Sequence, residues 1–196
     1  MWECWNARNR FVLAARAMSF YQQLLSSSDA VANGGGPRGV PPSAGVFKLN
    51  FDAGRAGDEE RGWEFVIRDH LGDIVLAGVK QDQGFQGAEL EEARECLFAL
   101  RKAVLHGFTR LVVEGDCISL IDRLKAKEKP SSAIGFFISD ILLVSTSFEF
   151  ISWAFVRREG NSVAHAIIHF QPINLMERIW EYEIPDSIIE LATKDV

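Results

Sequence analysis

Apolar and polar residues alternate along the stretch from residue 46 to residue 81. Residues 46–52 read VFKLNFD, and Trp63, Phe65 and Ile67 fall on one side of the next apolar segment, WEFVIRD. A third apolar run, DIVLAGVKQ, follows a short polar turn. Alternation with a period of two is typical of half-buried strands. Because the connections are short, these segments predict an antiparallel meander of three strands.

The pattern then changes to steps of three and four, which is the spacing of an amphipathic helix. The clearest helix covers residues 88–106 and ends at Gly107, since glycine enters the left-handed region freely. Residues 110–114, RLVVE, are almost continuously apolar. Such a run predicts a strand that is buried on both faces, as in parallel pairing. The apolar stripe of the helix consists of Leu90, Ala93, Leu97, Leu100 and Val104.

Further elements follow in alternation. The pattern predicts helices over residues 117–127 and 133–145, a fifth strand over 148–156, and a last helix from Asn161 to residue 170. The order β-β-β-α-β-α-α-β-α predicts an α/β fold, a mixed five-stranded sheet with helices packed on it. Because crossovers are right-handed, the first and fourth strands should be adjacent and parallel.

The segments outside this pattern set the domain boundaries. Residues 1–25 place apolar side chains at helical spacing beside several arginines, so we expect an N-terminal amphipathic helix. Residues 26–44 are rich in serine, glycine and proline, which is typical of a flexible linker. The globular domain should then occupy residues 45–172, and residues 173–196 should form a C-terminal tail.

Charge and cysteine content narrow the class of protein. The 196 residues carry a net charge of −6, which counts against a strong, non-specific binder of phosphate backbones but not against an enzyme that uses cations. The three cysteines form no Cys-x-x-Cys pair, so disulfides and zinc are not expected. No apolar stretch is long enough for a membrane span, and no secretory signal is visible. We expect a monomeric intracellular protein, nuclear or cytoplasmic, without membrane partners.

Three acidic residues stand out by position. Asp52 ends the first strand, Asp116 follows the fourth, and Glu89 lies in the first turn of the intervening helix. If strands one and four are neighbours, these side chains meet at the carboxyl ends of strands, where ligands bind in α/β sheets. Clustered carboxylates repel one another, and Mg²⁺ relieves that repulsion. The spacing is a weak signal by itself, because 27 acidic residues make chance meetings common.

Four motifs occur in order: KLNFDAG, GWEFVIRDHLGDIV, AELEEARECLFALRKAVLHGFTRLVVEGDC and FVRREGNSVAHA. Together they resemble the ribonuclease H-like domains of plant non-LTR retroelement reverse transcriptases, over about residues 46–170. The opening MWECWNARNRFVL is similar to the Trp-x-x-Trp-x-x-Arg-Asn segment that precedes this domain in such elements. The resemblance implies a ribonuclease H-like fold and metal-dependent cleavage of RNA in an RNA–DNA hybrid, with Mg²⁺ as cofactor and Mn²⁺ as a possible substitute.

The resemblance also implies roles for individual residues. The metal-binding carboxylates fall on Asp52, Glu89 and Asp116, with Glu92 as the alternative if the helix register shifts. The fourth acidic position of the family, in Asn-x-x-x-Asp, falls on His165, and the loop histidine that precedes it has no counterpart here. Imidazole suits Mg²⁺ less well than carboxylate does. His165 is therefore either a ligand or a helix histidine that hydrogen-bonds at the rim of the site.

Three further residues are candidates for contact with nucleic acid. Arg157 and Arg158 follow the last strand, where they either contact phosphate or form a solvated charge pair. Asn161 is a helix cap first and a nucleic-acid contact second. The sequence thus leaves open an active hybrid ribonuclease, a non-catalytic module that binds nucleic acid or protein, and a degenerate gene product without function.

Overall fold

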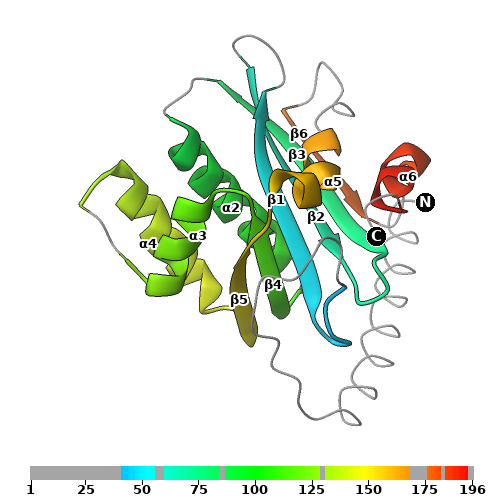
Figure 1. The fold of residues 1–196 in the computed structure, drawn as a ribbon, viewed down its shortest axis with the longest axis horizontal. Coiled ribbons are helices and arrows are strands. Elements are labelled where there is room, and N and C mark those ends of the chain that lie inside the picture. Colours follow the sequence, from blue (N-terminus) through cyan, green and yellow to red (C-terminus); the bar gives the residue numbers. More distant parts are fainter. Residues whose placement is uncertain are drawn as a thin grey trace, which may run out of the picture.

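The alternating segments form the strands of one sheet in the computed structural model, which describes residues 41–55, 60–83, 87–128, 131–167, 176–181 and 184–193. The sheet has six strands in the order β5-β4-β1-β2-β3-β6 (Figure 1). The predicted N-terminal helix over residues 1–25 lies outside the described residues, and so does the linker up to residue 40. The strands are β1 (Phe47–Arg55), β2 (Glu60–Arg68), β3 (Ile74–Gln83), β4 (Arg110–Gly115), β5 (Phe150–Phe155) and β6 (Glu177–Glu181).

Strand pairing follows the predicted topology. β1, β2 and β3 form the antiparallel meander, and β1 pairs with β4 in parallel. β5 pairs in parallel with the outer side of β4. The prediction that the first and fourth strands are adjacent and parallel is confirmed. The helical segments are α2 (Ala88–Leu105), α3 (Ile118–Ala126), α4 (Ala133–Ser145), the 3₁₀ helix η1 (Arg158–Asn161), α5 (Ser162–Ile167) and α6 (Asp186–Thr193).

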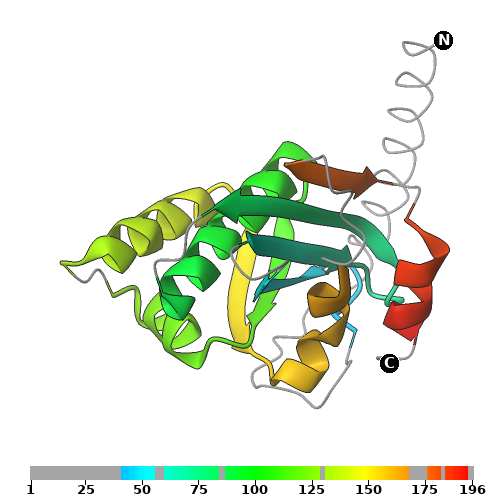
Figure 2. The ribbon, with the colours of Figure 1, turned by 90° about the horizontal axis from the view of Figure 1, so that it is seen from above.

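The helices cover both faces of the sheet (Figure 2). Phe65 and Ile67 of β2 belong to the main core, together with buried side chains of α2, α3 and α4. Val66, between them, points to the other face and packs with α5 and α6. This division follows from the period of two along a strand. Among the described residues, no helix is long and apolar enough to cross a membrane.

The sixth strand departs from the expected five-stranded sheet. β6 comes from the segment that was predicted to be a tail, and it pairs antiparallel with β3. Trp180 is buried in the smaller core, Glu177 forms an ion pair with Lys102 of α2, and Glu181 Oε1 lies 3.1 Å from Nδ1 of His106, which directly follows α2. Alternation over five residues, three of them charged, is too short a signal to predict a strand. Burial of Trp180 and pairing with β3 decide its structure.

Candidate metal centre

Three carboxylates from separate elements meet at one end of the sheet. Asp52 lies on β1, Glu92 on α2, and Asp116 directly after β4. Each offers one oxygen atom, and these atoms all lie within 4.8 Å of one another. In the parallel pairing of β1 with β4, Asn50 lies opposite Glu114. Asp52 and Asp116 come two residues after these paired residues on their own segments. Strand pairing therefore brings these two carboxylates together.

The glutamate of the group is Glu92, and the prediction of Glu89 is corrected. The side chain of Glu89 is about one third exposed and accepts a hydrogen bond from Arg123 Nε of α3 at 3.2 Å. Glu92 is buried against the sheet. The two positions lie three residues apart, close to one helical turn, so the sequence pattern permits both. The rotation of α2 against the sheet decides between them.

Burial and mutual repulsion favour the protonated forms of Asp52 and Glu92. The pKa of Asp52 rises from 3.8 to about 6, because the side chain is buried and lies near Asp116; His165 and Arg158 oppose the shift. The pKa of Glu92 rises well above its ordinary value for the same reasons, burial first and then Asp52 and Asp116. Glu92 Oε2 is buried and accepts no hydrogen bond from any described residue. A divalent cation would satisfy this oxygen and remove the repulsion, so the donor set fits Mg²⁺ or Mn²⁺.

His165 reaches the group through Asp52. Its Nδ1 lies 2.8 Å from Asp52 Oδ2, and its side chain is 43% exposed. The residue lies on α5, which packs on β1 and β2. One oxygen of Asp52 is thus engaged by imidazole on the α5 side. This geometry suits either a rim histidine that orients Asp52 or a histidine that shares a cation with it.

Asn161 makes a contact that belongs to neither of the two roles that the sequence predicts. Its side chain is 1% exposed, and Nδ2 donates a hydrogen bond to the backbone oxygen of Phe51 at 2.7 Å. A buried amide is poorly placed to contact nucleic acid, and this hydrogen bond is directed to β1 and not to a helix end. Asn161 therefore ties η1 to β1 at the residue that precedes Asp52.

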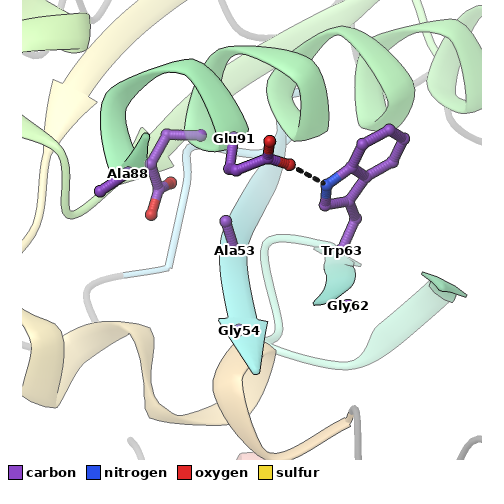
Figure 3. Close-up of a pocket in the computed structure, with 7 residues that line it drawn as sticks. Ala53, Gly54, Gly62, Trp63, Ala88 and Glu91 are labelled. Atoms are coloured by element: carbon purple, nitrogen blue, oxygen red, sulfur yellow. Dashed lines mark hydrogen bonds between the residues drawn. The ribbon is translucent and has the colours of Figure 1, made fainter. Parts of the chain in front are cut away.

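A small cavity of about 110 Å³ adjoins the carboxylate group and shares Glu92 with it. It opens between the end of β1, the start of β2 and the first turns of α2 (Figure 3). Trp63 Nε1 donates a hydrogen bond to Glu91 Oε2 at 3.3 Å across this space. The cavity leaves room beside the buried carboxylates. Its lining consists of Ala53, Gly54, Gly62, Trp63, Ala88, Glu91 and Glu92.

Comparison with known proteins identifies the family. Residues 50–170 match the family model described as Reverse transcriptase-like. The chain belongs to this family. No curated protein matches the chain. The match covers all three carboxylates of the centre and both arginines of the segment after β5.

Solved structures with the same fold are ribonucleases H. RNase H1 from Halobacterium salinarum NRC-1 is 21% identical, with a TM-score of 0.55 over 60% of this chain and 90% of that one. The N-terminal RNase H domain of Rv2228c from Mycobacterium tuberculosis is 18% identical, with a TM-score of 0.54 over 61% and 87%. LC11-RNase H1, solved in complex with an RNA/DNA hybrid, is 15% identical, with a TM-score of 0.54 over 60% and 90%. The reverse transcriptase-like domain therefore has the ribonuclease H-like fold.

The two arginines of this reverse transcriptase-like domain differ in their relation to the centre. Both are exposed, at the end of the segment that follows β5. Arg158 lies near enough to lower the pKa of Asp52 and of Glu92. No such influence of Arg157 on these two carboxyls is found. Arg158 is therefore a positive side chain that borders the centre.

Two buried acids near the centre were missed by sequence reasoning. Glu64 of β2 and Glu95 of α2 are both fully buried, and burial raises the pKa of each well above its ordinary value. In WEFVIRD, Glu64 occupies the polar side of an alternating pattern, and such positions usually face solvent. The covering helix α5 buries this side. Alternation along a strand does not predict which element packs on its polar face.

Proposed function

We propose that this domain is a divalent-metal-dependent ribonuclease that cleaves the RNA strand of an RNA–DNA hybrid. The observation that carries the proposal is the meeting of Asp52, Glu92 and Asp116 within 4.8 Å at one end of a ribonuclease H-like sheet. Membership of the reverse transcriptase-like family supports it. The motif resemblance to plant non-LTR retroelements further supports a retroelement origin.

In this proposal the three carboxylates hold Mg²⁺, or Mn²⁺ in its place. When bound, such ions supply an activated water and stabilise the leaving oxygen of a phosphodiester. His165 keeps one oxygen of Asp52 oriented by the contact between Nδ1 and Oδ2 at 2.8 Å. Arg158 borders the carboxylates and attracts the phosphate being cleaved, while Arg157 contacts the backbone farther along. Asn161 holds η1, and with it Arg158, against β1.

The proposed substrate is a hybrid duplex and not free DNA. LC11-RNase H1, a solved structure with this fold, is in complex with an RNA/DNA hybrid. A protein distinguishes RNA from DNA by the 2′-hydroxyl and by groove shape, without reading base sequence. The net charge of −6 predicts weak binding in the absence of divalent cations, because few phosphates are neutralised.

The alternative is a module that binds nucleic acid without cleaving it. The contact of His165 with Asp52 favours this alternative, because imidazole stands where the resemblance places a fourth carboxylate. A centre with one fewer negative charge binds Mg²⁺ more weakly. Tight hybrid binding without turnover, in Mg²⁺ and in Mn²⁺, is the result expected of such a module.

The test is a metal titration of hybrid cleavage by the full chain and by Asp52→Asn. The wild type should cut the RNA strand in Mg²⁺ or Mn²⁺ and leave DNA duplex intact. Asp52→Asn should fold, as judged by circular dichroism, and should lose at least about a hundredfold in cleavage rate, because metal ligands contribute several kcal/mol. A wild type that cuts no hybrid at any metal concentration refutes the proposal.

A further inference from the structure

Strand β2 brings one more carboxyl group next to the metal centre. Glu64 lies directly opposite Asp52 in the antiparallel register of β1 and β2. Residues that face each other across two strands project from the same side of the sheet, with Cβ atoms about 4.5–5.5 Å apart. Among the charged groups that act on Glu64, Asp52 has the largest influence, followed by Glu92. Glu64 is therefore the cross-strand neighbour of the first proposed metal ligand.

The environment of Glu64 does not explain a carboxyl group there. The residue is 0% exposed, and neither carboxyl oxygen has a hydrogen-bond partner in the part of the chain that the structure describes. The backbone N–H of Gly54 lies near enough to favour the ionised form, but not in the geometry of a hydrogen bond. Burying an unpartnered carboxyl group is unfavourable, whereas an apolar side chain would be stable at this position. The stability of the fold therefore gives no reason for an acid at this position.

Gly54 shows where the carboxyl group of Glu64 lies. A Cβ atom added to Gly54 would be 2.5 Å from Glu64 Oε1, so the carboxyl group fills the space above this glycine. Gly54 is two residues beyond Asp52 on β1, on the same face of the strand. It also lines the cavity that adjoins Glu92. The missing side chain at Gly54 thus makes room for Glu64 beside the centre.

We infer that Glu64 is a fourth carboxyl group of the cation centre, a positioning residue on β2 that strengthens divalent-metal binding by Asp52 and Glu92. The inference rests on the proposed metal site and deepens it. The ligand atoms that meet within 4.8 Å come from Asp52, Glu92 and Asp116, so Glu64 acts from behind them. Negative charge in this outer layer attracts the cation and offers an acceptor to the water around it. The fourth carboxyl group thus comes from β2, while His165 of α5 occupies the position where the motif resemblance places an acidic residue.

The test is calorimetric titration of the full chain with Mn²⁺ alone, in wild type, Glu64→Gln and Glu95→Gln. Glu95 serves as the comparison because it is equally buried and its oxygens have no hydrogen-bond partner among the described residues. It belongs to α2, and Glu64 and Glu92 affect it more strongly than the carboxyl group of Asp52 does, although the backbone N–H of Asp52 also favours its ionised form. Glu64→Gln should bind Mn²⁺ about tenfold more weakly, which is typical for the loss of an outer partner of a metal ligand. Glu95→Gln should change the affinity less. An unchanged affinity in Glu64→Gln, or an equal loss in both variants, overturns the inference.

A second variant moves the carboxyl group without removing it. Gly54→Ala places a methyl group against Glu64 Oε1, and the flexible end of that side chain can shift away. Gly54→Ala should also weaken Mn²⁺ binding, as Glu64→Gln does. If Glu64→Gln does not fold, the Mn²⁺ affinity of Gly54→Ala tests the inference. Normal Mn²⁺ binding in both variants, with hybrid cleavage intact, refutes the inference and leaves the proposed function standing. If the wild type cuts no hybrid but both variants bind Mn²⁺ more weakly, the inference is supported and the proposed function is not. A wild type that binds no Mn²⁺ refutes both the inference and the proposed function.

Discussion

At the scale of single residues, the centre consists of carboxyl groups that are buried close to one another, where the ionised form is unfavourable. Asp52 is 4% exposed and has Asp116, Glu64 and Glu92 around it. In water the carboxyl groups of Asp52, Glu64 and Glu92 would ionise near their ordinary pKa values, but burial and proximity raise these pKa values. This arrangement lowers the stability of the fold. The repulsion is useful only if a cation relieves it.

Because of these pKa shifts, the metal-free protein should become less stable as the pH rises. Between about pH 4 and about pH 6 folded Asp52 retains a proton that the unfolded chain has released, since its pKa rises from 3.8 to about 6. The stability associated with that proton is present at low pH and is lost as the pH rises through the folded pKa. Between about pH 5 and pH 7.5 the loss from Asp52 should be about 1–2 kcal/mol in the free energy of unfolding.

Urea unfolding in the presence of a chelator measures this dependence. Glu64, Glu92 and Glu95 have pKa values raised in the same direction, so the decline should continue to higher pH. Asp52→Asn should show a shallower decline than the wild type over the same range. A wild type whose stability increases over this interval without metal would contradict the electrostatic description.

At the scale of elements, the rotation of α2 about its axis decides which glutamate enters the centre. Glu89 and Glu92 are separated by three residues, or about 4.5 Å along the helix axis. The helix turns Glu92 toward β1, while Glu89 is held by Arg123 of α3. The two residues therefore offer a matched pair of variants on one helix.

Glu92→Gln should lose metal-dependent cleavage, and Glu89→Gln should retain it. The change in side chain is the same in both, and the helix propensities of glutamate and glutamine are close. Glu92→Gln removes a ligand, so its cleavage rate should fall at least about a hundredfold. Glu89→Gln loses an ion pair that is one-third exposed and worth at most about 1 kcal/mol of stability. Rates measured side by side at saturating Mn²⁺ decide the assignment, and the opposite ranking would restore Glu89.

At the scale of the whole molecule, the domain extends beyond the five strands that the sequence predicts. β6 and α6 complete the smaller core on the face opposite α2, where Trp180 and Ile188 pack against Val66 and Val79. Strand β6 also covers the outer edge of β3, which would otherwise present unpaired backbone groups. The C-terminal segment is thus an integral part of the sheet that supports the metal centre.

Trp180→Ala should therefore destabilise the entire domain. Trp180 is 5% exposed, and truncation of a buried tryptophan lowers the free energy of unfolding by about 3–5 kcal/mol. Urea unfolding monitored by circular dichroism measures the change. Met176→Ala, at an exposed position just before β6, should alter stability by about 0.5 kcal/mol or less. Equal stability of Trp180→Ala and wild type would show that β6 is not part of the cooperative unit.

The sequence by itself determined the elements between residues 46 and 156 and the pairing of strands one and four. It also identified Asp52 and Asp116, because each follows the paired part of two strands that the handedness of crossovers makes neighbours, although β1 continues past Asp52 to Arg55. These features depend on local periodicity and on a topological rule, and both are contained in the chain itself.

Tertiary structure alone decided the remaining features. The choice of Glu92, the burial of Glu64 and Asn161, and the place of β6 all depend on which surfaces pack together. Periodicity shows that a helix or strand has two faces, but the rotation of α2 and the cover supplied by α5 arise only when the elements meet. On the polar side of β2, Val66 packs in the smaller core and Glu64 lies beside Asp52, and neither neighbour is visible in the alternation.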